Sequence, residues 1–210
     1  MSHPSAIWQA EYKPYQLRVA ASLGLTIPRT VVTNDPTAIR SAFQSLGELI
    51  IKPTRTGHII KDGAEYAVYT SRLLAEHLDD LESARLSPSI YQALIPKKYD
   101  IRVTIVGDRY FAAAIDSPSD PAAHLDWRQT ENPKLPHYPV TLPDELVAML
   151  RQLMERLGLT FGAIDLVETP AGEYVFLEVN PSGQWLWIDN MLNLGITDAV
   201  ADWLSREDQL

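Results

Sequence analysis

A β-hairpin pattern late in the sequence constrains the fold more than any other feature. Two apolar runs, Phe161–Val167 and Tyr174–Val179, are separated by a short stretch that contains a proline and a glycine, both of which favour turns. A second pair of apolar runs, residues 100–106 and 110–115, flanks Gly107-Asp108. Because hairpins build antiparallel sheets, and helical patterns lie between them, the sequence predicts an α+β fold with mostly antiparallel sheets.

The predicted register of the late hairpin brings two carboxylates together. If Thr169 pairs with Tyr174, Asp165 lies opposite Glu178, and Asn180 shares the face of Glu178 because it lies two residues further along the strand. Facing carboxylates with Cβ atoms about 5 Å apart repel each other unless a cation neutralises them. A divalent cation such as Mg²⁺ fits, since it takes a few carboxylate or amide oxygens and leaves other positions to water and phosphate. The alternative is that both acids lie on the solvent-exposed face of an ordinary sheet.

The remaining pattern predicts two lobes. Helices are expected over residues 4–23, 36–46, 71–81 and 143–157, and strands over residues 30–33, 49–53, 67–69 and 90–95. We expect the N-terminal helix and a smaller lobe over residues 1–91, a larger lobe over residues 92–210, and a hinge at about 92–96. Residues 117–139 are rich in Pro, Asp and His without a clear period, and a loop of that length is usually functional or disordered.

Composition excludes several classes of protein. The chain has no cysteine, so disulfides, thiolate metal sites and a cysteine nucleophile are excluded. Its 27 acidic and 18 basic residues give a net charge of −9, which argues against binding to nucleic acid or to a membrane through a basic face. No apolar run approaches the roughly 20 residues of a membrane span, and the N-terminus lacks a signal-peptide pattern, so a cytoplasmic location is expected.

Two basic residues on predicted strands have different interpretations. Lys52 ends an apolar strand and precedes the polar loop of residues 54–58, a position that suits contact with a phosphate. A solvent-exposed lysine at a sheet edge has the same pattern. On another predicted strand Asp100 and Arg102 share one face, so an ion pair between them is the simplest interpretation of that arginine.

Taken in order along the chain, these features resemble the ATP-grasp superfamily. The ordered set consists of Lys13, Lys52, Tyr91-Gln92-Ala93-Leu94-Ile95, Asp100-Ile101-Arg102, Asp165 and Glu178-Val179-Asn180. The segments 95–104 and 176–185 are similar to the ATP-grasp ligases of the microviridin or graspetide type, which mature ribosomally made peptides. The resemblance extends from about Pro4 to Trp203.

The resemblance implies that ATP binds between the two lobes. Lys13 and Lys52 would contact its phosphates, and residues 54–58 would form a flap over them. The adenine would be bound at the hinge, mostly through the backbone of Gln92, Ala93, Leu94 and Ile95, with Asp100 near the ribose.

The resemblance also implies a Mg²⁺ site and a reaction. Asp165, Glu178 and Asn180 would be the Mg²⁺ ligands, and Arg102 would face the transferred phosphoryl and acyl groups. The family reaction activates a carboxylate as an acyl phosphate, which an amine or hydroxyl attacks to give an amide or ester with ADP and phosphate. Such a reaction needs positioning and charge neutralisation and no covalent help from a protein nucleophile.

Two departures from the family pattern bear on function. Ala93 stands where a glutamate is common, and the relatives carry a further N-terminal domain before the region of Lys13, which we expect this chain to lack. The apolar residues Ile7, Trp8 and Tyr15 of the opening helix then predict a homodimer, or a partner subunit in place of that domain.

Three functions remain open at this point. The leading hypothesis is an ATP- and Mg²⁺-dependent carboxylate ligase that acts on a precursor peptide. The second is a small-molecule carboxylate–amine ligase, and the third is a nucleotide-binding accessory subunit without turnover.

Overall fold

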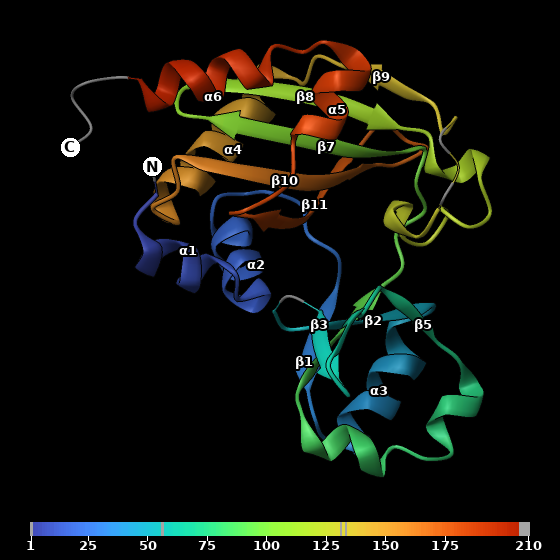
Figure 1. The fold of residues 1–210 in the computed structure, drawn as a ribbon. Coiled ribbons are helices and arrows are strands. Elements are labelled where there is room, and N and C mark those ends of the chain that lie inside the picture. The colour runs from blue at the N-terminus through green and yellow to red at the C-terminus, as the bar shows by residue number, and fades with distance from the viewer. Residues whose placement is uncertain (1, 56, 131, 133, 206–210) are drawn as a thin grey trace.

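Two antiparallel sheets, one in each of two lobes, organise the chain (Figure 1). The structure is a computed structural model that describes residues 2–55, 57–130, 132 and 134–205. All strand pairings in both sheets of this described part are antiparallel, and helices pack against each sheet. The predicted α+β class with antiparallel sheets is confirmed.

The smaller lobe is built from one sheet and one α-helix. Its elements are β1 (Thr30–Thr33), α3 (Pro36–Leu46), β2 (Leu49–Pro53), β3 (His58–Lys61), β4 (Ala64–Ala67), β5 (Ser71–Leu73), two 3-10 helices (Ala75–Leu78 and Glu82–Leu86) and β6 (Ser89–Ala93). The sheet has the order β1-β6-β2-β5, and β3 and β4 form a separate hairpin. The Asp35 carboxylate caps α3 by accepting the Thr37 N–H, and Ile39 of this helix packs against Leu49 and Tyr91 in the small core.

The larger lobe has a five-stranded sheet with helices on both faces. Its elements are β7 (Tyr99–Val106), β8 (Arg109–Ile115), β9 (His137–Pro139), α4 (Asp144–Arg156), β10 (Phe161–Glu168), β11 (Tyr174–Asn180), α5 (Leu186–Leu192) and α6 (Ile196–Leu204), and the sheet has the order β11-β10-β7-β8-β9. Within the described residues, no helix is both long and apolar enough to cross a membrane.

The alternation of side chains along β7 decides what each face of the large sheet can hold. Ile101, Val103 and Ile105 belong to the main core, which α4 covers. Because neighbouring residues on a strand point to opposite faces, Arg102 and Thr104 lie on the other face. That face is covered only in part, by α5 and α6, which leaves polar side chains room beside β10 and β11.

The opening of the chain differs from the prediction of one helix in the first lobe. Residues 4–23 form two helices, α1 (Pro4–Ala10) and α2 (Lys13–Ser22). Tyr12 between them is extended (φ −80°, ψ 98°), and Pro14, which has no N–H to continue the first helix, lies in the first turn of the second, where proline is favoured. Both helices pack against the core of the larger lobe, through Ala10 and Leu17 among others. Helices α1 and α2 therefore lie with the second half of the chain.

The segment after residue 54 also differs from the prediction. The expected helix over residues 71–81 is wrong: residues 71–73 form β5, which pairs with β2, and only short 3-10 turns follow. The hairpin of β3 and β4 was not predicted, although its turn is Asp62-Gly63 with both residues at positive φ, a common hairpin turn. Thr56, in the predicted flap of residues 54–58, lies outside the described residues.

The apolar residues of the opening helices have different environments. Ile7 and Tyr15 pack against the core of the larger lobe, whereas the Trp8 side chain is 67% exposed, with the Arg55 guanidinium 4.3 Å from its ring centroid. The predicted homodimer contact at this helix rests on Trp8 and stays a prediction.

The tight turn between β7 and β8 gives a first test of the packing. Gly107 has a φ of +60°, and a Cβ placed there would overlap the ring of Trp203 on α6. We expect Gly107→Ala to lower the free energy of unfolding by about 2–3 kcal/mol, from the strained φ and from overpacking against the ring. Gly172→Ala is the matched control, because Gly172 also has a positive φ (+82°) but its Cβ would meet no atom within 4 Å. Equal losses in the two variants, measured by urea denaturation, would show that the Trp203 contact contributes nothing.

Candidate functional site

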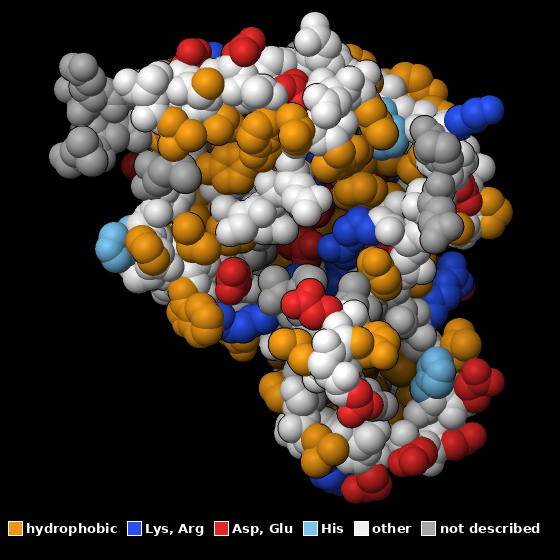
Figure 2. Space-filling model, in the orientation of Figure 1, with side chains coloured by type: hydrophobic (Ala, Val, Ile, Leu, Met, Phe, Trp, Pro, Cys, Tyr) orange, Lys and Arg blue, Asp and Glu red, His pale blue; other side chains and the backbone are white. Residues whose placement is uncertain are grey.

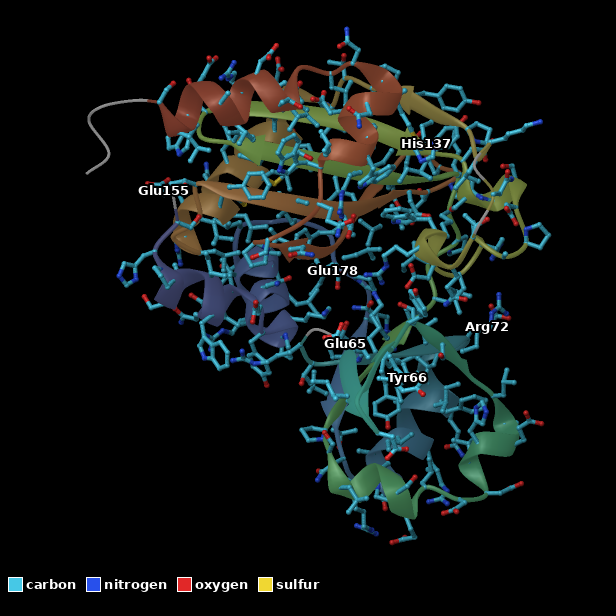
Figure 3. All side chains as sticks on the ribbon, in the orientation of Figure 1. Glu65, Tyr66, Arg72, His137, Glu155 and Glu178 are labelled. Carbon is cyan, nitrogen blue, oxygen red and sulfur yellow. The ribbon has the colours of Figure 1, made fainter. Side chains whose placement is uncertain are left out.

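A cleft between the two lobes collects almost all of the predicted site residues. It encloses about 220 Å³. Among the residues that line it are Lys13, Lys52, Gln92, Ala93, Leu94, Ile95, Asp100, Asp165, Glu178 and Asn180. Figure 2 shows a hollow between the lobes where basic and acidic side chains gather, and Figure 3 shows Glu178 on the side of the larger lobe that faces the smaller one.

The carboxylates of Asp165 and Glu178 lie on directly opposed residues of β10 and β11, as the sequence predicts, but through a different register. Tyr174 pairs with Glu168, one residue earlier than predicted, and that register alone would set Leu177 opposite Asp165. A β-bulge accommodates Leu177 as an extra residue of β11 and returns Glu178 to its place. Bulges re-aim side chains next to functional sites, and this one aligns the two acids.

Arg102 lies on the adjacent strand β7 and pairs with Asp165 in register. Its Nη1 donates to Asp165 Oδ1 at 2.6 Å, and its side chain is 8% exposed. The predicted ion pair of Arg102 with Asp100 is therefore not formed. Burial and the nearby negative charge of Glu178 raise the pKa of the Asp165 carboxyl, and the positive charge of Arg102 lowers it. Burial has the largest effect, so the pKa lies above its ordinary value.

Helix α2 positions Lys13 against Glu178. The side-chain amide of Gln16, one turn further along α2, pairs with the free edge of β11: it accepts the Val179 N–H at 2.9 Å and donates to the Val179 carbonyl at 2.7 Å. This pairing satisfies an edge strand that the rest of the sheet leaves open. It brings Lys13 Nζ to 3.5 Å from Glu178 Oε2.

Lys52 enters the cleft from the smaller lobe, at the end of β2. Burial and the positive charge of Lys13 lower the pKa of its ammonium group, and the negative charge of Glu178 raises it. Burial has the largest effect, so the pKa lies below its ordinary value. Glu178 shows the complementary shift: burial raises its pKa, but Lys13, Lys52 and Arg128 outweigh burial and bring the pKa below its ordinary value. The site therefore favours an ionised Glu178 among several cations.

The Gln92 side chain lies in the wall of the cleft and is 1% exposed. Its Nε2 donates to Thr30 Oγ1 at 2.9 Å, whereas its Oε1 has no hydrogen-bond partner among the described residues. A buried amide oxygen without a partner is costly, so a donor on a bound molecule would be favoured there.

The backbone that follows β6 has one N–H group that is available to bind a ligand. The N–H of Ala93 donates to the Arg29 carbonyl at 2.9 Å and the N–H of Leu94 to the Glu48 carbonyl at 2.8 Å. The N–H of Ile95 has no partner within the described part of the chain. The predicted hinge thus retains a backbone donor beside the cleft.

Asp100 lies in the cleft wall but is already engaged. Its Oδ2 accepts from Lys97 Nζ at 2.8 Å and from Ser117 Oγ, and all three residues are largely buried. The structure therefore gives Asp100 a local cation, Lys97, that the sequence analysis did not consider.

Three further residues of the cleft were missed from the sequence. Gln16, Asp126 and Arg128 all line it, and none belongs to a motif that marks it. The loop of residues 117–139 was expected to be functional or disordered on length and composition, and these two signals do not identify single residues. Gln16 has no sequence signal, because a polar residue on a helix is ordinarily exposed.

Whether the cleft can hold a divalent cation depends on the side-chain oxygen atoms that it offers as ligands. Among the described residues, no group of three His, Asp or Glu side chains could hold a metal ion. The predicted set instead has two carboxylates and the amide of Asn180, which is exposed and whose Oδ1 accepts the Ser182 N–H at 2.9 Å. Hard oxygen ligands without nitrogen or sulfur suit Mg²⁺, which usually keeps water or phosphate oxygens at its remaining positions. The residues present therefore fit Mg²⁺ bound together with a polyphosphate.

Comparison with known proteins identifies the fold. No protein-family model and no curated protein sequence matches the chain, but solved structures do. A RiPP-associated ATP-grasp ligase from Chryseobacterium gregarium, in complex with ADP and a leader and core peptide, is 32% identical over 96% of this chain, with a TM-score of 0.88. The macrocyclase MdnC from Microcystis aeruginosa MRC, bound with precursor peptide MdnA, is 34% identical over 95% of the chain, with a TM-score of 0.79.

A third structure adds a metal. The ATP-grasp ligase PsnB, complexed with a phosphomimetic variant of a minimal precursor, Mg and ADP, is 25% identical over 94% of the chain, with a TM-score of 0.73. The chain spans about three fifths of the length of these structures: 61%, 61% and 60%. The expected ATP-grasp fold and the resemblance to ligases that act on ribosomal peptides are confirmed.

Proposed function

We propose that this chain, which has the ATP-grasp fold and resembles the RiPP-associated ligases, binds ATP with Mg²⁺ in its cleft and activates a carboxylate of a precursor peptide. The observation that carries the proposal is the pair of opposed carboxylates on β10 and β11, surrounded by cations from both lobes. A triphosphate with its metal would satisfy both sets of charges at once.

The phosphates would lie near the two lysines. Lys13 Nζ is held by the Arg55 carbonyl at 2.8 Å and by Glu178, and Lys52 faces the same carboxylate from the other lobe. The lowered pKa of Lys52 indicates that its ammonium group is poorly neutralised, so an added phosphate would stabilise its charged form. Asp165, Glu178 and Asn180 would hold Mg²⁺, whose charge would offset the negative charge of the phosphates.

The adenine would bind at residues 92–95. The unpaired N–H of Ile95 could donate to a ring nitrogen, and the unpaired Oε1 of Gln92 could accept from the exocyclic amine. Ala93 has no side-chain group to take part, so the backbone and Gln92 would provide the recognition. Asp100, with Lys97, would lie near the ribose.

The chemistry would be a two-step acyl transfer. A substrate carboxylate oxygen attacks the γ-phosphorus of ATP, which forms an acyl phosphate and releases ADP. A hydroxyl or amine then attacks the acyl carbon, which forms an ester or amide and releases phosphate and a proton. Arg102, buried and bonded to Asp165, would provide positive charge next to the transferred group.

Several parts of this proposal concern the whole protein. All three of these related structures hold a leader, core or precursor peptide or a variant of one, and this favours a peptide substrate over a small molecule. Four points stay predictions: the product (ester or amide), the boundary of the lobes at residues 92–96, the oligomeric state and a cytoplasmic location.

The function is tested with the purified chain, ATP, Mg²⁺ and synthetic peptides that contain Thr or Ser, Lys, Asp and Glu. Ligation predicts ADP release together with the loss of one water from the peptide for each bond, measured by mass spectrometry. ADP release with amino acids or dipeptides and not with longer peptides would favour the small-molecule ligase. Nucleotide binding without turnover on any acceptor would favour the accessory subunit.

The nucleotide part of the proposal has a separate test. We expect Lys52→Met to weaken ATP binding by about tenfold or more, because a charged contact to phosphate is lost. Its thermal stability without ligand should stay level or rise, since the fold lowers the pKa of Lys52 and so disfavours its charged form. Calorimetric titration with ATP and Mg²⁺ measures the change. Lys98→Met is the control, because Lys98 is about half exposed, pairs with Glu168 and does not line the cleft; wild-type affinity in the Lys52 variant would exclude the contact.

A further inference from the structure

The loop of residues 117–139 places an arginine in the cleft that the proposed function does not yet use. Asp126, Trp127 and Arg128 lie at a short 3-10 turn of this loop (Trp127–Gln129) and all line the cleft. The Asp126 carboxylate holds Arg128 at two points: Arg128 Nε donates to Oδ1 at 2.8 Å and Nη2 to Oδ2 at 2.6 Å. Such a bidentate pair fixes the guanidinium in one plane.

Asp126 also joins the two lobes. Its Oδ2 accepts the backbone N–H of Thr70, in the smaller lobe just before β5, at 3.4 Å. The neighbouring Gln129 donates from Nε2 to the Thr70 carbonyl at 3.3 Å. Both backbone groups of Thr70 are thus bound by one turn of the larger lobe, so the position of that turn depends on how the lobes are arranged.

The guanidinium lies close to the predicted metal ligands. Arg128 Nη1 is 4.0 Å from Glu178 Oε1, on the oxygen that Lys13 does not contact. Burial raises the pKa of Glu178, and the charges of Lys13, Lys52 and, to a smaller extent, Arg128 lower it to below its ordinary value. The Arg128 side chain is 47% exposed, so a molecule in the cleft can reach it, while its Asp126 partner is 4% exposed.

Trp127 anchors the turn to the larger lobe. Its ring lies 5.0 Å from the ring of Trp187, between centroids, and the Arg102 guanidinium lies 5.7 Å from its centroid. The backbone that presents Arg128 is therefore held by aromatic packing.

We propose that Arg128 is the counter-cation of Glu178 in the ligand-free chain and a further phosphate-binding residue when nucleotide occupies the cleft. This inference rests on the proposed function. A divalent cation that arrives at Glu178 meets the positive charge of Arg128, and Nη1, the nitrogen that Asp126 does not hold, would donate to the negative phosphates. Asp126 and Thr70 make this arrangement dependent on the approach of the two lobes.

The proposal predicts opposite changes in two affinities. Without nucleotide, removal of the Arg128 charge should strengthen binding of a bare divalent cation, because a competing positive charge about 4 Å from its ligand is lost. Without metal, the same change should weaken binding of ADP, because a charged contact to phosphate is lost. A residue that only holds the loop in place cannot produce two changes of opposite sign.

The experiment uses Arg128→Met, Arg128→Lys and the control Arg85→Met. Arg85 is an exposed arginine of the smaller lobe that pairs with Glu82 and does not line the cleft. Mn²⁺ binding without nucleotide is measured by electron paramagnetic resonance, and ADP binding in EDTA by calorimetry. For Arg128→Met we expect Mn²⁺ to bind about threefold to tenfold more tightly and ADP about tenfold more weakly. Arg128→Lys, which keeps the charge, should stay closer to the wild type in both affinities. The control Arg85→Met should have the same affinities as the wild type.

The outcomes are distinct. If wild-type chain does not bind ADP at all, the proposed function fails, and this inference fails with it. Two results would overturn the role of Arg128 while the proposed function stands, provided that the wild type binds ADP. In the first, Arg128→Met has unchanged affinities for Mn²⁺ and ADP. In the second, it loses both affinities together with thermal stability. Asp126→Asn is the second variant: it removes the negative charge that offsets Arg128 and leaves the guanidinium in place, so Mn²⁺ should bind more weakly than to the wild type and ADP no more weakly, the opposite of Arg128→Met.

Discussion

Glu178→Gln should reduce ATP-dependent turnover at least about a hundredfold, the largest effect that we expect on activity. The substitution preserves shape and hydrogen-bonding size but removes one of the two opposed carboxylates that would hold Mg²⁺. It also removes the anion that faces Lys13, Lys52 and Arg128. ADP formation at saturating ATP and varied Mg²⁺ measures the loss, which added Mg²⁺ should restore only in part.

The same variant has a defined effect on stability. From the sequence alone, relief of carboxylate repulsion predicts a level or raised melting temperature. The structure reverses this expectation, because the cations around Glu178 outweigh burial and lower its pKa in the folded state. A carboxyl with a lowered folded-state pKa stabilises the fold above its unfolded-state pKa of about 4.3 and loses that contribution as the pH falls through the folded-state value. We therefore expect a small decrease in melting temperature at pH 7 that disappears in acid.

Glu168→Gln is the control for both measurements. Glu168 lies on the same hairpin, pairs with Lys98 at 2.8 Å and does not line the cleft. Its substitution should leave turnover unchanged. Wild-type turnover in Glu178→Gln would remove Glu178 from the metal site, and an increase in its melting temperature would show that repulsion from Asp165 dominates after all.

Arg102→Met should lower the free energy of unfolding by about 3 kcal/mol, the largest stability effect that we expect, and abolish turnover. Arg102 and Asp165 form a 2.6 Å ion pair in which the side chains are 8% and 16% exposed. Removal of the arginine leaves a buried carboxylate without its main partner, next to the like charge of Glu178. Asp165 then takes up a proton more readily, so the loss of stability should grow as the pH rises.

Two further variants show whether the effect belongs to the ion pair. Arg102→Met combined with Asp165→Asn removes both charges and should recover most of the lost stability while turnover stays absent. Arg109→Met breaks an ion pair with Asp202 in which the side chains are 39% and 64% exposed, and it should cost less than about 1 kcal/mol. A loss below 1 kcal/mol in Arg102→Met, measured by urea denaturation, would contradict the buried ion-pair argument.

Local patterns were sufficient for the central strands and for the opposed acids of the site. The alternation of apolar and polar residues predicted both hairpins of the large sheet, and with it the approach of Asp165 to Glu178. The reasons are local: neighbouring strands joined by a short turn pair with each other, and side chains two apart share a face. The turn alone did not set the register, however, and the bulge at Leu177 aligns the acids.

The order of motifs along the chain indicated the ATP-grasp fold and the resemblance to ligases of ribosomal peptides, which no single motif could do. Lys52, the residues 92–95 and Asn180 each have an ordinary alternative, such as an edge lysine, a buried strand or a turn residue. Their common location in one cleft follows from the fold that the ordered set indicates.

The tertiary structure alone decided where segments that are distant in sequence meet. Helices α1 and α2 join the larger lobe because their apolar faces find its core, and Gln16 covers the open edge of β11. Segment 71–73 becomes a strand because β2 offers it an edge, against a helical local pattern. Arg128 reaches Glu178 through a loop without periodicity. These outcomes depend on the free energies of contacts between remote residues, whereas periodicity and turn chemistry report only on neighbours. The sequence by itself therefore determined the two hairpins of the large sheet and the acids that they carry, and the packing of the lobes determined β5 and the electrostatics of the site.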